Sequence, residues 1–345
     1  MVILDFAAKD ISLLLKGFSV SPLFYNFLLE QISYIGLDRA AISSYTHQKF
    51  DPVLNGKRIS MIKIYKLWNA MEKLSNRSDI GLMIADNFTL DRAGIVGELF
   101  LSTKNLKQSL RIVQRFMSLI IGNITIKYEE AGDDAIFYFD VIPRFIMPFS
   151  AIECFIKICY NWVNQYHKDV KLQIEEIHYC KPKPKHFNYY KDNFPNTEVF
   201  FNQVKNLVIV KKDIFYIEHP KHIYKHYKYL LKYAQKLKKH LPTSSFKNSV
   251  KNQLLIKMAD GKCHINEIAQ DFSISTSTLK RKLKEENTTF SKILKELRKE
   301  LSLLMLKDKT LSYEEIAYLL GYSEYSPFFR AFKHWFKKCP SHFRE

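Results

Sequence analysis

The chain has 345 residues, 47% of them hydrophobic, and a formal net charge of +18. Its length exceeds the usual range of a single hydrophobic core, so we expect at least two domains. No stretch approaches the roughly 20 apolar residues of a membrane-spanning helix, and the N-terminus lacks the basic segment and apolar run of a secretory signal, so we expect no membrane partner and a cytoplasmic location.

The first 220 residues combine helical and strand patterns. Apolar residues recur at helical spacing within four stretches, 13–32, 62–74, 106–116 and about 148–166. Strand-like runs occupy residues 124–128, 136–141, 173–179, 198–201 and 206–210. The turn residues Gly132, Asp133 and Asp134 separate the first two runs and predict a hairpin. We therefore predict a mixed α/β domain over residues 1–220.

Residues 221–246 form a basic amphipathic helix and a linker. Apolar residues at spacings of 4, 3, 4, 3 and 4 form a heptad stripe along which two protomers can pair, namely Ile223, Tyr227, Leu230, Ala234, Leu237 and Leu241. Residues 221–240 also hold seven Lys and no acidic residue, and these charges would repel across a parallel seam. The alternative is that the stripe docks on its own domain. Pro242 then breaks the helix.

The next segment has the pattern of a helix-turn-helix unit. A short helix carries Ile265, Ile268 and Ala269, a turn follows at residues 272–274, and Ser275 is a good N-cap for a second helix. That helix buries two leucines, Leu279 and Leu283. Its polar side exposes Ser277, Lys280, Arg281 and Lys284, which can donate hydrogen bonds to bases or phosphates.

The same pattern recurs about fifty residues later. Ile316, Ala317 and Leu320 form a helix that ends near Gly321, a residue that tolerates positive φ. In the following helix Phe328 and Phe332 share an apolar face, while the residues directed elsewhere are Tyr325, Ser326, Phe329 and Arg330. Pro327 fits only in a first helical turn, so this helix begins near Ser326. Such a helix is suited to a DNA groove.

A long helix over residues 290–306 connects the two units. Its apolar side carries Ile293, Leu297 and Leu301 among others, and its outward basic residues are expected to be Lys292, Lys295, Arg298 and Lys299. A rigid connecting helix would keep a constant distance between two DNA-reading helices.

Residues 247–345 resemble the DNA-binding domain of the AraC/XylS family of bacterial transcription regulators. The family's second-unit pattern is met by Ile316, Ala317, Gly321, Tyr322, Phe328, Arg330, Phe332 and Lys333, and its usual ending by Pro340 and Arg344. Two departures are Lys337, where a Gly is usual, and Pro327 inside the second recognition helix. The resemblance implies a fold of class α+β, with an all-α tandem helix-turn-helix domain after the mixed domain.

From this resemblance we expect two recognition helices in successive major-groove segments of double-stranded DNA. The base-reading residues would be Ser277, Lys280 and Arg281 in the first helix and Tyr325, Ser326 and Arg330 in or beside the second. The alternative for Arg330 is a structural or backbone contact, which its position can make in this family. Lys284, Lys333 and the lysines of the connecting helix would hold phosphates. Ser275 and Phe329 complete the candidate DNA-binding set. The resemblance also implies RNA polymerase as a partner.

The front part, over roughly residues 20–215, resembles the arabinose-binding-like effector domain that accompanies some of these regulators. It shares local runs such as Ile80-Gly81-Leu82 and Ala93-Gly94-Ile95-Val96-Gly97. We expect a small-molecule effector, and its aromatic contacts would be Tyr128, Tyr138, Phe145 and Trp162. The alternative is that these rings are part of the hydrophobic core.

No motif indicates a cofactor, a metal site or an enzyme. The five cysteines form no Cys-x-x-Cys pair, and His222 with His226 has no third ligand. The leading function is a sequence-specific transcription regulator, an activator controlled by a small effector or by homodimerisation. One alternative is an architectural DNA-binding protein with little sequence preference. Another is a DNA reader joined to an enzyme with a reactive cysteine, which the apolar surroundings of Cys154 and Cys159 disfavour.

Overall fold

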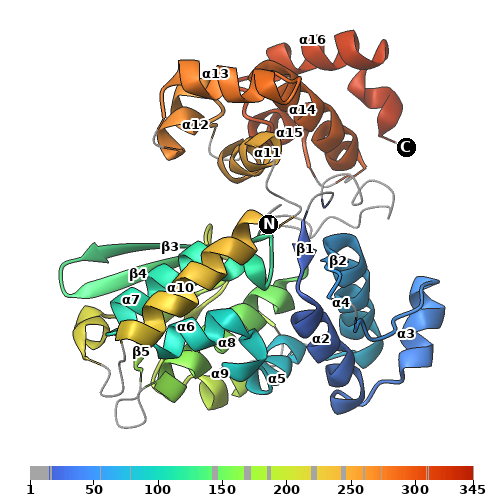
Figure 1. The fold of residues 1–345 in the computed structure, drawn as a ribbon. Helices are drawn as coiled ribbons and strands as arrows, with labels where there is room; N and C mark the ends of the chain where they lie inside the picture. The colour runs from blue at the N-terminus through green and yellow to red at the C-terminus, as the bar shows by residue number, and fades with distance from the viewer. Residues whose placement is uncertain are drawn as a thin grey trace. The chain divides into compact units, whose positions relative to one another are not determined.

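A computed structural model gives the arrangement of most of the chain. It describes residues 15, 18–54, 56–77, 79–141, 147–166, 172–184, 188–218, 224–241, 246–258, 261–272, 274–307, 309 and 311–344. These residues form two compact units (Figure 1). The first unit spans residues 18–241, with the gaps just given, and the second spans residues 246–344. We describe each unit by itself.

The first unit contains α-helices, 3₁₀ helices and strands. Its helices up to the hairpin are α2 (Pro22–Tyr34), α3 (Arg39–Thr46), α4 (Met61–Ser75), α5 (Ile80–Asp86), η1 (Asp91–Ala93), α6 (Ile95–Leu101), α7 (Leu106–Phe116) and η2 (Met117–Leu119). The later helices are α8 (Phe149–Tyr166), α9 (Asn188–Asn193), η3 (Lys212–Tyr216) and α10 (Tyr224–Lys239). The strands are β1 (Ser19–Val20), β2 (Ile59–Ser60), β3 (Ile124–Ala131), β4 (Asp134–Val141), β5 (Ile174–His178), β6 (Glu198–Phe200) and β7 (Leu207–Lys211).

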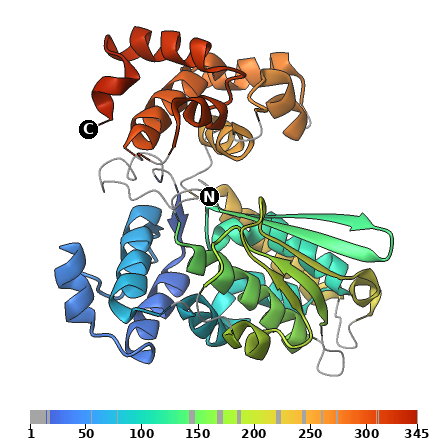
Figure 2. The same cartoon turned by 180° about the vertical axis from the view of Figure 1, so that it is seen from behind.

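All five strand-like runs of the sequence are strands of one sheet, in the order β3-β4-β7-β5-β6. The predicted hairpin is confirmed, with Ile126 opposite Phe139. Among the described strands, only β5 and β6 pair in parallel. Along β4 the burial alternates strictly, so that Ala135, Phe137 and Phe139 lie on the buried face. Helices α7 and α8 contribute to the cover of that face, and Figure 2 shows the sheet from the other side.

Much of helix α8 is buried, and α5 packs closely along it. A Cβ atom on Gly81 would lie 2.0 Å from the carbonyl oxygen of Ser150, so only glycine permits this approach. The Ser150 hydroxyl in turn accepts a hydrogen bond of 2.8 Å from the indole of Trp68 on α4. The Ile80-Gly81-Leu82 run of the sequence is therefore a packing motif.

The first observed helix, α2, begins later than the apolar pattern in the sequence indicated. The pattern over residues 13–32 predicted one helix, but α2 begins only at Pro22, because Ser21 caps it by accepting a hydrogen bond from the Phe24 backbone N–H. Leu13 and Leu14 lie outside the described residues. Residues 19–20 form a short strand with residues 59–60 instead.

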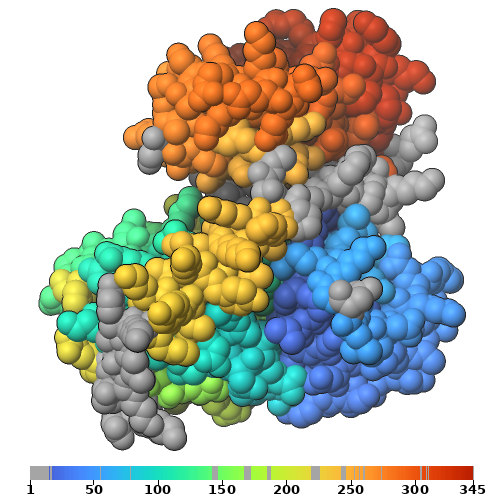
Figure 3. All heavy atoms as spheres, in the orientation of Figure 1, coloured from blue at the N-terminus to red at the C-terminus, as the bar shows by residue number. Residues whose placement is uncertain are grey.

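Helix α10 packs on α6 of its own unit and forms part of the unit's outer surface (Figure 3). Ala234 is fully buried, and the Lys238 ammonium donates a hydrogen bond to the Arg115 carbonyl. Burial lowers the pKa of Lys238. Tyr229 and Tyr233 are exposed on the helix. The boundary between the two compact units follows Leu241.

The described part of the second unit contains helices and no strand. They are α11 (Phe246–Lys257), α12 (Ile265–Asp271), α13 (Thr276–Glu285), α14 (Phe290–Leu306), α15 (Tyr313–Leu319), α16 (Tyr325–Phe336) and η5 (Pro340–Phe343). The predicted fold class, a mixed α/β domain followed by an all-α domain, is confirmed. None of the described helices in either unit combines the length and apolar character that crossing a membrane requires.

Candidate nucleic-acid interface

The first helix-turn-helix unit consists of α12 and α13, and its helix ends agree with the sequence. The Ser275 hydroxyl accepts a hydrogen bond of 3.1 Å from the Thr278 backbone N–H, which confirms it as the N-cap of α13. Asn287 follows the helix with φ of 53°. The carboxylate of Glu286 accepts hydrogen bonds from the backbone N–H groups of Phe246 and Lys247 and so ties α11 to the end of α13.

Helix α13 has one buried and one open side. Leu279 and Leu283 are fully buried. The candidate DNA contacts are all exposed, namely Ser275, Ser277, Lys280, Arg281 and Lys284. Arg281 forms an ion pair of 2.6 Å with Glu285, but both side chains keep more than half of their surface exposed. Because such an exposed pair is weak, the guanidinium can exchange this partner for a base or phosphate.

The second helix-turn-helix pair consists of α15 and α16, within the same compact unit. Ser312 and Glu315 form a capping box at the start of α15. Gly321 ends this segment with φ of 71°, and a Cβ atom there would lie 2.8 Å from the Cys263 sulfur. The turn therefore requires glycine both for its conformation and for its packing.

Helix α16 begins at Tyr325, within one residue of the predicted start. Pro327 is its third residue, where no intrahelical N–H bond is needed. Phe328 and Phe332 are fully buried, as predicted.

The candidate DNA contacts of α16 differ in exposure. Ser326, Arg330 and Lys333 are exposed. Tyr325 and Phe329 are half-buried, with ring centroids 5.6 Å apart. Burial raises the pKa of Tyr325, and a tyrosine hydroxyl is in any case a hydrogen-bond donor at neutral pH. The two rings thus form an apolar patch beside three exposed polar groups.

The prediction that Arg298 faces outward from the connecting helix is wrong. Its guanidinium donates hydrogen bonds of 2.9 Å to the carbonyl oxygens of Leu320 and Gly321, and it lies 4.0 Å from the centre of the Tyr322 ring. Helix α14 thereby holds the turn that precedes α16. The sequence periodicity missed this role because it describes one helix at a time, whereas the partners are more than twenty residues away. Lys292 and Lys295 are exposed, as predicted.

Lys337 takes over the backbone role of the glycine that is usual in the family's pattern. It is the C-cap of α16 with φ of 57°, a left-handed conformation. Its backbone N–H donates a hydrogen bond to the Lys333 carbonyl. A side chain in this conformation costs free energy relative to glycine.

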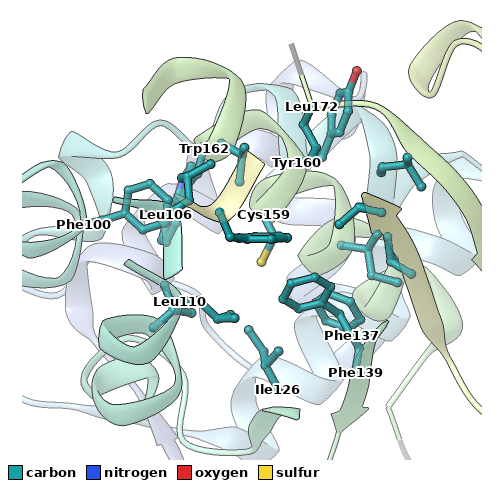
Figure 4. A pocket seen from close by; sticks show the side chains of 17 residues that line it. Phe100, Leu106, Leu110, Ile126, Phe137, Phe139, Cys159, Tyr160, Trp162 and Leu172 are labelled. Atoms are coloured by element: carbon teal, nitrogen blue, oxygen red, sulfur yellow. The ribbon is translucent and has the colours of Figure 1, made fainter. Parts of the chain in front are cut away.

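The candidate effector residues do not come together in the structure. Trp162 lines a cavity between the sheet and α8 (Figure 4). Tyr138 lies on the opposite face of β4, because side chains alternate along a strand. The Tyr128 ring contacts Phe137 and Phe215 but does not line the cavity, and its hydroxyl donates to Glu130. Phe145 lies outside the described residues.

Most of the cavity wall was missed by the sequence analysis. Its 17 lining residues are Phe100, Leu106, Leu110, Val113, Ile126, Phe137, Phe139, Ile156, Cys159, Tyr160, Trp162, Val163, Leu172, Ile174, Val208, Val210 and Phe215. The signal that exists in the sequence is the inward set of alternate strand positions. That set identifies the core but does not show where the core is hollow.

The candidate dimer stripe is engaged within its own unit. Ala234 is fully buried there, while Tyr227, Leu230, Leu237 and Leu241 are half-buried. Ile223 lies outside the described residues. A dimer along this stripe would therefore need α10 to change its packing on α6.

Cys154 and Cys159 are not activated thiols. Burial raises the pKa of Cys159 to about 12 and that of Cys154 well above its usual value. Thiols in such surroundings are poor nucleophiles. Among the described residues, no group of three or more His, Cys, Asp or Glu side chains can hold a metal ion. His222 lies outside these residues.

Two family models match this chain, one in each unit. A family model described as a helix-turn-helix domain matches residues 268–345, and one described as the N-terminal arabinose-binding domain of the AraC transcription regulator matches residues 51–215. The ornithine utilization regulator of Pseudomonas aeruginosa is 24% identical over 329 residues, which are 92% of this chain and 94% of the relative. The transcriptional activator CfaD of Escherichia coli is 31% identical over 100 residues, which are 29% of this chain and 37% of CfaD. The solved structure of the transcriptional regulator CdpR from Pseudomonas aeruginosa aligns with 93% of this chain and 98% of its own, at 16% identity and a TM-score of 0.43.

Proposed function

Because the chain belongs to the AraC/XylS family of transcription regulators, we propose that it reads a two-part site in duplex DNA and activates transcription there under the control of a small effector. Helix α13 would enter one major-groove segment and α16 the next, about one helical turn away. The observation that carries this proposal is the placement of the two helices. Both views of the second unit put α13 and α16 on the same side of it (Figures 1 and 2).

The residues of each helix have separate roles in this proposal. Ser277, Lys280 and Arg281 read bases in the first segment. Tyr325, Ser326 and Arg330 do so in or beside the second, with Phe329 as an apolar neighbour. Ser275, Lys284 and Lys333 contact the phosphate backbone, which gives affinity and salt dependence without sequence choice. Apart from the half-buried Tyr325, the polar members of both sets are exposed and so are accessible to DNA.

The test is selection and sequencing of duplexes that the full-length protein binds from a random library, at about 0.15 M salt. We expect two short conserved segments spaced by about 10 base pairs, one helical turn. A library that shows no preference, while binding falls steeply with salt, would instead indicate an architectural DNA-binding protein.

We further propose RNA polymerase as a partner and the cytoplasm as the location, because an activator works at promoters. The relative CfaD, an activator by name, supports activation.

A homodimer along α10 is a separate proposal. It requires α10 to change its packing, because Ala234 is buried within its own unit. Replacing Leu230 and Leu237 by Lys should convert such a dimer to a monomer in sedimentation. Replacing the exposed Tyr229 and Tyr233 by Lys serves as the control, and an unchanged mass for the leucine variant would exclude the stripe.

A further inference from the structure

The cavity of the first unit has an unusual wall for a domain whose family model carries the name of a sugar. About 80 Å³ of space lies among 17 side chains from α6, α7, α8, the sheet, η3 and Leu172, which precedes β5. Figure 4 shows these side chains converging on the space, with the Cys159 sulfur directed into it. All the lining residues belong to one compact unit, so the cavity does not depend on how the two units are arranged.

Apart from the Cys159 thiol, the polar atoms of the described lining side chains form hydrogen bonds elsewhere or point away from the space. The Trp162 indole donates a hydrogen bond of 3.1 Å to the Phe88 carbonyl. The Tyr160 hydroxyl points away from the space in Figure 4. Cys159 offers a thiol, which is a weak hydrogen-bonding group. The remaining lining side chains are hydrocarbon.

Such a wall selects a ligand by its chemistry. A sugar hydroxyl or an amino-acid ammonium placed here would lose its hydrogen bonds to water and find none in return, which is strongly unfavourable. An apolar molecule gains from leaving water and fills space that the side chains leave empty. We propose that this cavity is the effector site and that its ligand is a small, uncharged, predominantly apolar molecule. This inference rests on the proposed function, in which the first unit binds an effector.

The size of the cavity limits the ligand further. An engineered apolar protein cavity of roughly 150 Å³ binds benzene or xenon. The 80 Å³ seen here therefore accommodates a xenon atom at once, while a ring requires a small outward shift of the wall. Tightly packed interiors transmit such shifts to neighbouring elements.

One residue of the cavity wall connects an outward shift of that wall to helix α10. Phe100 belongs to α6, and α6 packs against α10. Helix α10 is the last described helix of the unit before the chain continues into the DNA-binding unit. A ligand that displaces Phe100 thus changes the support of the helix that leads to the DNA-reading part of the chain.

Two neighbouring residues on β7 provide a matched pair of variants. Val208 is buried and lines the cavity, whereas Ile209 points to the other face of the sheet. Val208→Phe fills the cavity, and Ile209→Phe adds a comparable ring outside it. Cys159→Leu fills the cavity from α8 and serves as a second filling variant if Val208→Phe does not fold.

The experiment uses the full-length protein with xenon, benzene, L-arabinose and L-ornithine as probes. Xenon binding is followed by the saturable shift of its NMR signal, and the others by the melting temperature. We expect a saturable xenon signal and a rise of about 2 °C or more with benzene, the direction that binding to the folded state requires. Both effects should disappear in a filled variant and persist in Ile209→Phe.

Three outcomes would overturn the inference. One is the absence of any saturable xenon or benzene effect, which would mean that the space is only a packing void. Another is a rise in melting temperature with arabinose or ornithine but not with benzene. The third is an unchanged benzene effect in both filled variants. The DNA selection is run in parallel without probes, and a two-part motif recovered there would leave the proposed function standing even if the cavity binds nothing.

Discussion

The two units of this protein place their candidate sites in opposite ways. In the DNA-binding unit the candidate contacts are mostly exposed and stand on helices whose other faces are buried. In the first unit the candidate ligand site is a hollow inside the hydrophobic core. A surface site can be found from periodicity, because polar residues on an otherwise amphipathic helix stand out. An internal site of hydrocarbon side chains has the same residue types as the core around it.

The largest expected effect comes from substituting one buried and one exposed residue of α16. Phe332 is fully buried and Arg330 is exposed on the same helix. Phe332→Ala should lower the free energy of unfolding of the DNA-binding unit by about 3 to 5 kcal/mol, because it leaves a cavity. Denaturant unfolding of the full-length protein measures this loss. Arg330→Ala is the control and should leave stability nearly unchanged while it weakens DNA binding. Equal losses of stability would contradict the division between the two faces.

Arg298 is the position where a residue expected at the surface proved to be structural. Arg298→Met should cost about 2 to 3 kcal/mol, because the carbonyl groups of Leu320 and Gly321 lose a charged donor. The selected DNA motif should lose definition in the half read by α16 more than in the half read by α13. Lys292→Met, at an exposed position of the same helix, should change neither. A motif weakened equally in both halves would mean that Arg298 does not position α16.

A variant of Arg281 tests whether an exposed residue of α13 reads a base. Arg281→Ala should cost about 1 to 3 kcal/mol of binding on the preferred site and relax discrimination there. Affinity is measured on the selected duplex and on a random duplex at the same salt concentration. Glu285→Gln, which removes only the ion-pair partner, should preserve the discrimination. An equal loss on both duplexes would assign Arg281 to phosphate contact.

The smallest predicted effect concerns the departure from the family pattern at the end of α16. Lys337→Gly should stabilise the DNA-binding unit by about 0.5 to 1 kcal/mol, since glycine adopts positive φ without a Cβ penalty. The midpoint of denaturant unfolding reports the change. Lys338→Gly is the neighbouring control, because Lys338 is not among the residues with positive φ. A destabilised Lys337→Gly variant would show that the lysine side chain contributes more than the strain costs.

Local signals predicted much of the fold. The Ser275 cap, the positive φ of Gly321 and the position of Pro327 all follow from the preferences of single residues over one or two helical turns. The hairpin turn and the strand runs were found in the same way. The two candidate recognition helices could be placed from the sequence for this reason, although their roles on DNA stay a proposal.

Other features depend on partners that are distant along the chain. Nothing near Arg298 indicates that it binds two carbonyl groups beyond the next turn. Tyr138 and Phe137 are neighbours in sequence, yet only Phe137 faces the cavity. The stripe on α10 is compatible with a partner helix or with its own domain, and the packing of Ala234 on its own unit required the tertiary structure.

The sequence by itself determined the fold class and the tandem helix-turn-helix architecture, because these follow from short-range patterns of apolar residues, caps and turns. Only the tertiary structure decided which aromatic residues surround a hollow, where Arg298 points and which face α10 buries. The physical reason is that packing is a property of side chains brought together from remote segments, and the volume left between them is not encoded at any single position.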